Sequence, residues 1–148
     1  MCLILFARGV APGSPLLLAA NRDEFFARPT LPAAWWPDHP DILAGRDQKA
    51  GGTWLGVSRS GRFAAITNFR DPATRRDDAP SRGALVGDFL LGNEPPEAYL
   101  RRIAPDVNRF NGFSLLVAQN NELWFLSNRG QAQLRKSGQV QFRVSPGI

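Results

Sequence analysis

The sequence predicts an α+β fold in which helices pack on antiparallel sheet. Short apolar runs bounded by Gly, Pro, Asn and Asp recur in both halves of the chain, as expected for strands. Two helical patterns stand next to each other between these halves. The strands and helices therefore do not alternate regularly, as the βαβ units of a parallel sheet would require.

The first half of the chain predicts two hairpins separated by a long loop. Residues 3–7 and 16–21 are apolar runs joined through Gly and Pro, which indicates two strands and a tight turn. Residues 28–41 contain four prolines and the pair Trp35-Trp36, so we expect an extended loop there. Residues 53–58 and 62–68 predict a second hairpin around Ser60-Gly61, and its second strand is apolar on both faces.

The second half predicts a surface loop, two helices and a third hairpin. Residues 71–82 are polar, and Ser81 is the expected N-cap of a helix over 82–91 that ends at Gly92. Pro95-Pro96 begins a second helix that stops before Pro105. Residues 113–118 and 123–127 flank Asn120-Asn121, which is typical of a hairpin turn. The last residues, 145–148, form a turn signal that predicts a disordered end or a fragment.

Length and composition limit the class of protein. A chain of 148 residues with 43% hydrophobic and 21% charged residues is typical of one globular domain, so we expect residues 1–148 to form a single domain. No apolar run approaches the roughly 20 residues of a membrane helix. The apolar N-terminus precedes Arg8 instead of following a positive charge, which is unlike a secretory signal and favours a cytoplasmic protein.

Charge and metal-ligand counts exclude further classes. The net charge is +5, but the arginines are scattered and no run of five basic residues occurs, so we do not expect nucleic-acid binding. Cys2 is the only cysteine and His39 the only histidine. An internal disulfide is thereby excluded and a zinc site is not expected.

Cys2 is a candidate nucleophile because of its position. If Met1 is removed, one residue carries both a thiol and a free α-amine. The α-amine has a pKa of about 7.7 to 8.0, close to the pH at which a general base works best. The competing interpretation is an ordinary buried cysteine in a first strand.

Polar residues follow the second predicted strand directly. Asn21, Arg22, Asp23 and Glu24 stand where an apolar strand ends, and such a cluster is costly to bury unless it pairs or binds a ligand. Arg22 could hold a carboxylate or an oxyanion, and Asp23 could orient an ammonium group. A salt-bridged turn would explain the same residues. Asn68, at the end of another strand, could donate to a developing oxyanion or simply cap a turn.

Several ordered motifs resemble the NRDE family, also called the transport and Golgi organisation protein 2 family. They are Met1-Cys2, Asn21-Arg22-Asp23-Glu24, Arg28-Pro29-Thr30, Gly45-Arg46-Asp47, Gly52-Thr53-Trp54-Leu55-Gly56, Thr67-Asn68-Phe69-Arg70 and Ser81-Arg82-Gly83. In that family a substantial further segment follows, so the resemblance implies that this chain is an N-terminal portion. Ser114 stands where the family usually shows asparagine, and we assign it no role.

The family is similar in turn to N-terminal nucleophile (Ntn) hydrolases with cysteine, such as penicillin V acylases. That similarity implies a four-layer α/β/β/α sandwich, incomplete here at its C-terminus, and an amide hydrolase with no cofactor. It gives Cys2 the nucleophile's place and Asn68 the oxyanion place. Those enzymes separate arginine from aspartate by two residues, whereas Arg22 and Asp23 are adjacent, so the catalytic member of residues 21–24 stays open.

The resemblance also allows a carrier without catalysis, because eukaryotic members are associated with Golgi organisation and with handling haem or acyl-CoA lipids. Trp35, Trp36 and Trp54 would then form walls, and Arg46 or Arg70 would meet a carboxylate or phosphate. The expected partner is a small-molecule amide or an amphipathic ligand. His39 is available as a haem ligand, or is simply solvated on the proline-rich loop. A sheet that lacks strands would expose an edge and favour a homodimer. The predicted ligand-binding residues are Arg46, Asp47, Thr53, Trp54 and Arg70.

Overall fold

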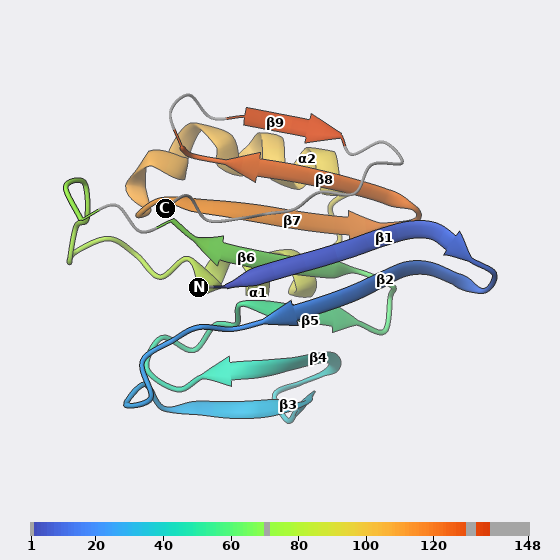
Figure 1. Ribbon diagram of the computed structural model, residues 1–148, viewed down its shortest axis with the longest axis horizontal. Helices are drawn as coiled ribbons and strands as arrows, with labels where there is room; N and C mark the ends of the chain where they lie inside the picture. The colour runs from blue at the N-terminus through green and yellow to red at the C-terminus, as the bar shows by residue number, and fades with distance from the viewer. Residues whose placement is uncertain (1, 70–71, 130–132, 137–148) are drawn as a thin grey trace.

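The computed structural model describes residues 2–69, 72–129 and 133–136 (Figure 1). A two-stranded antiparallel sheet is formed by β1 (Leu3–Ala11) and β2 (Ser14–Asn21). A seven-stranded antiparallel sheet has the order β3-β4-β5-β6-β7-β8-β9. Its strands are β3 (Thr30–Trp36), β4 (His39–Asp47), β5 (Leu55–Ser58), β6 (Phe63–Asn68), β7 (Phe113–Gln119), β8 (Glu122–Ser127) and β9 (Gln133–Lys136).

The two sheets pack face to face, and helices cover the other face of the larger sheet (Figure 1). Helices α1 (Gly83–Leu91) and α2 (Pro96–Ile103) are followed by a short 3-10 helix, η1 (Ala104–Arg109). The predicted α+β sandwich of antiparallel sheets is confirmed. No described helix covers the outer face of β1 and β2, so the described residues form three of the four expected layers.

Strand β6 is buried on both faces, as the sequence predicted. Ala64 and Ile66 belong to the core on the helical side, whereas Phe63 and Ala65 face the β1–β2 hairpin. Side chains alternate between the two faces of a strand, so an unbroken apolar run is required only where both faces are covered. β6 is therefore the central strand between the two cores.

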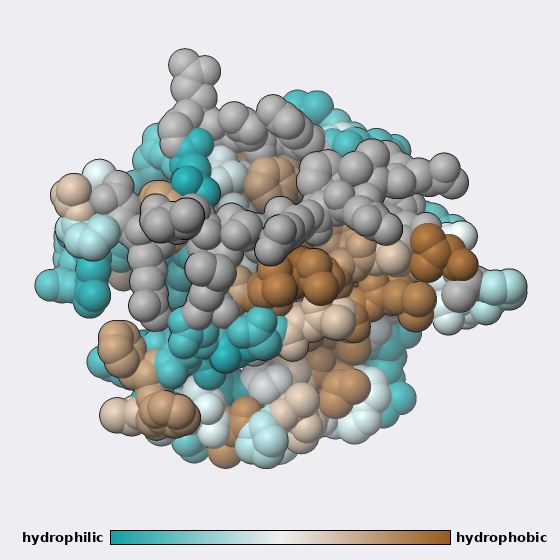
Figure 2. All heavy atoms as spheres, in the orientation of Figure 1, coloured by the Kyte–Doolittle hydropathy of each residue, from teal (hydrophilic) through white to brown (hydrophobic). Residues whose placement is uncertain are grey.

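The outer face of the β1–β2 hairpin is apolar and open to solvent. Ile4 and Phe6 point into the core, while the alternate residue Leu5 is 46% exposed and Leu17 on β2 is 44% exposed. Figure 2 shows apolar residues gathered over this hairpin on the face turned to the viewer.

The predicted hairpins are present, and their turns explain why the sequence revealed them. β7 and β8 are joined by Asn120 and Asn121, both with positive φ, as a tight two-residue hairpin turn requires. Gly61, with φ of +75°, lies in the turn between β5 and β6. β5 itself begins at Leu55, two residues later than predicted.

The extended loop predicted over residues 28–41 is wrong, because this segment contains β3 and the start of β4. β3 is an edge strand, and Pro32 lies where the β3–β4 register shifts between Leu31 and Ala34. Pro37 lies in the turn, and Pro40 precedes Ile42, where pairing of β4 with β5 begins. Prolines are tolerated at such positions because no ladder hydrogen bond needs their missing N–H.

The helices lie where the sequence placed them, with one correction. α1 ends at Leu91 before Gly92, and α2 ends before Pro105. The predicted N-cap Ser81 is wrong, since Arg82 occupies that position and no side chain caps the helix. Neither α1, with nine residues, nor α2, with eight, nor any other described helix could cross a lipid bilayer. Residues 72–82, the described part of the predicted surface loop, contain no helix or strand. The predicted turn at 145–148 lies outside the described residues.

Candidate functional site

The start of β1 and the ends of β2, β4 and β6 lie on the same side of the molecule, at the left in Figure 1. A cleft of about 360 Å³ opens there. Most of the side chains singled out in the sequence line this one cleft. They are Cys2, Arg22, Asp23, Glu24, Arg46, Asp47, Thr53, Trp54 and Asn68.

The Cys2 thiol contacts the backbone of Asp23. The Asp23 N–H donates to Sγ at 3.3 Å, and Sγ lies 3.7 Å from the Asp23 carbonyl oxygen, to which a thiol can donate. Leu3 pairs with Asn21 in the antiparallel hairpin. Cys2, which precedes Leu3, is therefore brought close to the residues that follow Asn21. Cys2 is half-buried. The structure therefore places the thiol in the polar cleft and not deep among aliphatic side chains.

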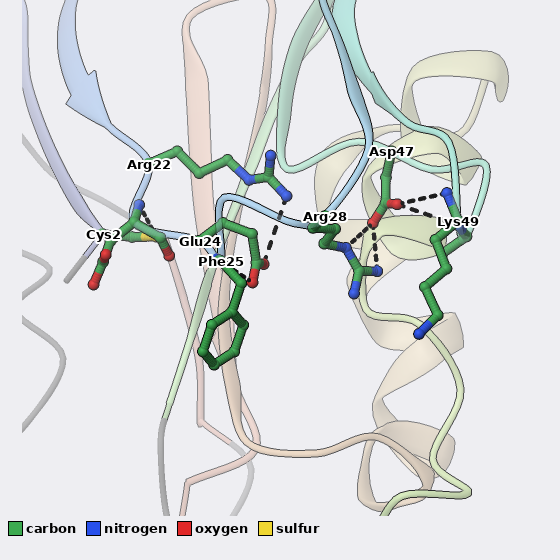
Figure 3. A network of polar contacts seen from close by, with 9 residues as sticks. Cys2, Arg22, Glu24, Phe25, Arg28, Asp47 and Lys49 are labelled. Carbon is green, nitrogen blue, oxygen red and sulfur yellow. Dashed lines mark hydrogen bonds and ion pairs between the residues drawn. The ribbon is translucent and has the colours of Figure 1, made fainter.

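Arg22 and Glu24 form an ion pair beside the thiol, with 3.5 Å between Nη2 and Oε2. Glu24 also accepts the backbone N–H of Phe25 at 3.0 Å, as Figure 3 shows. Asn21 ends β2 and is exposed, and it does not line the cleft. Three of the four polar residues of this segment thus face the cleft.

Arg28 and Asp47 form the best-connected ion pair of the cleft. Nε and Nη2 of Arg28 donate to Oδ2 of Asp47 at 2.8 and 2.6 Å, while Oδ1 accepts the backbone N–H groups of Lys49 and Ala50. Partial burial by itself raises the pKa of Asp47, but these hydrogen bonds outweigh it and lower the pKa below its usual value. Asp47 therefore stays ionised and fixes the turn after β4.

Arg46 lines the cleft but is already engaged. Nη1 and Nη2 donate to the two carboxylate oxygens of Asp38 at 2.6 and 2.8 Å, and the guanidinium stacks 4.5 Å from the ring centroid of Trp36. Nε donates to the carbonyl of Gly51. Of the two arginines that the carrier interpretation offered as partners of a ligand anion, Arg46 is thus paired with Asp38, and Arg70 lies outside the described residues.

One wall of the cleft is built by a close approach of two backbones. A Cβ on Gly52 would lie 2.6 Å from the carbonyl carbon of Gly83, so only glycine fits there. The next residue, Thr53, is buried and donates from its hydroxyl to the carbonyl of Leu55 at 3.0 Å. Trp54 is half-buried and packs against both cores.

Asn68 lies at the end of β6, opposite Phe113 of β7, and is half-buried. Among the described residues, its side-chain amide has no hydrogen-bond partner, although it lines the cleft. An amide in this position can donate to a ligand oxygen without first breaking a protein contact.

Sequence reasoning gave no site role to Arg28, Lys49 or Arg82, which also line the cleft. Arg82 is half-buried, and its Nη1 donates to the carbonyl of Gly112 at 2.9 Å. Arg28 and Arg82 could have been recognised from the family motifs Arg28-Pro29-Thr30 and Ser81-Arg82-Gly83.

Other candidates lie elsewhere. Trp36 is buried in the core, where its indole N–H donates to Ala44, and Trp35 lies on the surface under Arg59. Neither these tryptophans nor His39 line the cleft, so they do not form walls together with Trp54. In the described part of the chain, no three His, Cys, Asp or Glu side chains gather as a metal site would need.

The fold and site together define an α+β protein with two packed antiparallel sheets and a polar cleft at one end of them, which is lined by Cys2, the second residue of the chain. The sequence profile of the family described as "Transport and Golgi organisation 2" matches residues 1–145. The chain belongs to this family, which confirms the resemblance seen in the motifs.

Curated relatives carry the same family name. The mouse "Transport and Golgi organization 2 homolog" is 37% identical over 145 residues, covering 90% of this chain and 52% of its own length. The human homolog is 38% identical over 143 residues, covering 88% of this chain and 51% of its own. The Drosophila melanogaster protein is 34% identical over 128 residues, covering 78% and 45%. The chain thus spans about half the length of the curated relatives it matches.

Proposed function

We propose that this protein is a hydrolase that cleaves the carbon–nitrogen bond of an amide, with Cys2 as its nucleophile. The observation that carries the proposal is the hydrogen bond from the Asp23 N–H to Cys2 Sγ, at the edge of a cleft that Asn68 also lines. The thiolate is the reactive form of cysteine, and the Asp23 N–H is placed to donate a hydrogen bond to it.

The chemistry needs no group beyond the chain and water. Once Met1 has been removed, the α-amine of Cys2 accepts the thiol proton while Sγ attacks the amide carbon. The tetrahedral intermediate collapses, the C–N bond breaks, and the departing amine takes up that proton. Water, deprotonated by the α-amine, then attacks the thioester and releases a carboxylic acid and the free thiol.

Side chains of the cleft take the supporting roles. Asn68 donates to the oxyanion that forms in both steps, because its amide lines the cleft and has no described partner. Arg22, paired with Glu24, holds the strand end that supplies the Asp23 N–H to the sulfur. Asn21 is exposed and has no place in this scheme.

The state of the first residue tests the proposal. Mass spectrometry of the purified full-length protein should show loss of Met1, and Cys2 should react with iodoacetamide faster at pH 7 than free cysteine does. A panel of acyl p-nitroanilides should be cleaved with a burst, and Cys2→Ala should abolish cleavage while leaving the fold unchanged. A retained Met1, or a thiol that reacts no faster than free cysteine, overturns the mechanism.

A carrier for an amphipathic ligand is the second candidate, and one observation favours it. Phe25 and Phe26, next to the cleft-lining Glu24, are 72% and 109% exposed, which is unusual for adjacent aromatic residues. An acyl chain or a haem edge could lie against them. The names of the mouse and human relatives mention transport and Golgi organisation, which agrees with either function.

Fluorescence separates the two functions. Trp54 lines the cleft, so titration with haem or a long-chain acyl-CoA should give a saturable change if the protein is a carrier. Phe26→Ser should weaken that binding. No saturable change with either ligand contradicts the carrier and leaves the hydrolase.

We also propose that residues 1–148 fold as a single domain that works in the cytoplasm.

An exposed sheet edge favours a homodimer. Among the described strands, β3 lies at an edge of the larger sheet, and an edge can pair with a second chain. Light scattering coupled to gel filtration should then give the mass of a homodimer. A monomer at all concentrations would contradict pairing.

A further inference from the structure

Arg82 stands apart from the other described arginines that line the cleft. Arg22 pairs with Glu24, Arg28 with Asp47, and Arg46 with Asp38. No described carboxylate forms an ion pair with Arg82, and the one described hydrogen bond of its guanidinium goes to the neutral carbonyl of Gly112. Four of its five N–H donors therefore have no described protein acceptor.

The surroundings of Arg82 are unfavourable for an uncompensated cation. Burial lowers its pKa; the charge of Glu24 opposes that shift, and the charges of Arg28 and Arg75 add to it. Glu24 does not serve as a dedicated counterion, because its carboxylate is held by Arg22 and by the Phe25 N–H. Lys49 is a second cation of the lining that has no described ion pair.

We propose that Arg82, with Arg28 as the neighbouring cation, binds a carboxylate or phosphate group of the ligand that enters the cleft. The planar guanidinium presents parallel N–H donors that match two oxygens of either group. A half-buried guanidinium with unused donors gains most from such a partner, because little water competes for them.

This site is independent of the amide cleavage proposed above, since it needs only the cleft and its cations. Where both hold, the substrate of Cys2 is an anionic amide. Arg82 lies at the start of α1, next to the close contact of Gly52 with Gly83, so its backbone is fixed by packing. An anion bound there would have a defined position relative to the cleft walls.

The test is a titration of the full-length Cys2→Ala protein, in which catalysis plays no part. The ¹⁵N–¹H resonance of Arg82 Nε is followed while inorganic phosphate, acetate or chloride is added at constant ionic strength. Phosphate or acetate should give a saturable shift, and chloride should not. Saturation with phosphate alone identifies a phosphoryl group, and saturation with acetate identifies a carboxylate.

Variants establish that Arg82 is responsible. Because substitutions of Arg82 remove its Nε–H group, binding to the variants is followed at the indole N–H of Trp54, which lines the same cleft. Arg82→Gln should weaken binding about tenfold or more, the usual worth of a charged hydrogen bond. Arg101→Gln removes the same charge from an exposed arginine of α2 and should leave binding unchanged. If Arg82→Gln does not fold, Arg82→Lys keeps the charge but loses the fork and should weaken acetate binding more than phosphate binding. Shifts that stay linear for all three salts, or that centre away from Arg82, overturn the proposal.

Discussion

Arg28 and Asp47, 19 positions apart in the sequence, are joined by two hydrogen bonds from Nε and Nη2 to a single carboxylate oxygen, Oδ2. The pair connects the segment after β2 with the end of β4, and so it ties together two of the strand ends that form the cleft. The second carboxylate oxygen of Asp47 holds the following turn. The Asp47 side chain therefore holds both the turn after β4 and the segment that carries Arg28.

Asp47→Asn should destabilise the protein by about 2 kcal/mol at neutral pH, because Arg28 loses a charged acceptor. The pKa of Asp47 is lowered in the folded state, so this contribution is present above the unfolded value near 4 and disappears as the pH falls through the folded value. The difference between wild type and variant should shrink below about pH 4. Asp106→Asn, at an exposed aspartate of η1, is the control for urea unfolding at each pH. A difference that stays constant down to pH 2 would contradict this assignment.

Arg62 is a buried arginine for which the sequence gave no signal. It is 2% exposed and donates to the carbonyls of Phe89 and Glu94 and to the side chain of Gln119, at 2.8 to 2.9 Å. It lies directly before β6 and is thereby joined to the end of α1, to the link between α1 and α2, and to the end of β7.

Arg62→Met should cost about 3 kcal/mol or more, because three acceptors lose a charged donor at once. The exposed pair of Arg101 with Glu97 is the matched control, and Arg101→Met should cost less than about 0.5 kcal/mol. Urea denaturation of both variants measures the difference. Equal losses would mean that the Arg62 network adds nothing beyond a surface ion pair.

Local signals explain which parts of the fold the sequence predicted. The Asn120-Asn121 turn and the two-sided apolar run of β6 are set by neighbouring residues, so the pattern alone identifies them. The β3–β4 hairpin was missed because four prolines suggested a loop. Whether a proline disrupts a strand depends on which N–H groups the neighbouring strand needs, and that is decided by the sheet order.

The candidate site was predictable as a set of residue types but not as a network. Strand ends carry polar residues, so Asn21–Glu24 and Asn68 were recognisable before their meeting place was known. Arg46 or Arg70 was expected to meet an anionic group of a ligand, yet the guanidinium of Arg46 is paired with the protein's own Asp38. The Arg82 contact with Gly112 spans 30 positions and depends on where the start of α1 lies relative to the residue before β7. Such partners follow from tertiary packing, which single-residue patterns do not contain.

Asn68→Ala tests the oxyanion role in the proposed hydrolase. Loss of one oxyanion donor typically lowers kcat about 10² to 10³-fold, with little change in KM if the ground state does not use the contact. Asn93→Ala, at an exposed asparagine between α1 and α2, should leave both constants unchanged. The measurement is steady-state hydrolysis of the acyl p-nitroanilide that is cleaved fastest. An unchanged kcat would remove Asn68 from the mechanism.

Gly52→Ala should destabilise the protein and disturb the cleft together. Its Cβ would lie 2.6 Å from the carbonyl carbon and 2.7 Å from the carbonyl oxygen of Gly83, and backbone atoms cannot rotate away as a flexible side chain can. We expect a loss of about 1 to 3 kcal/mol, the usual cost of overpacking. Because α1 begins at Gly83, the same displacement should shift Arg82 and reduce anion binding.

Gly87→Ala is the control, since a Cβ there meets nothing within 4 Å and should stabilise α1 by up to about 1 kcal/mol. The midpoints of thermal unfolding of the two variants should therefore move in opposite directions. A Gly52→Ala protein as stable as wild type would show that the segment between β4 and β5 can move away from the start of α1 without cost.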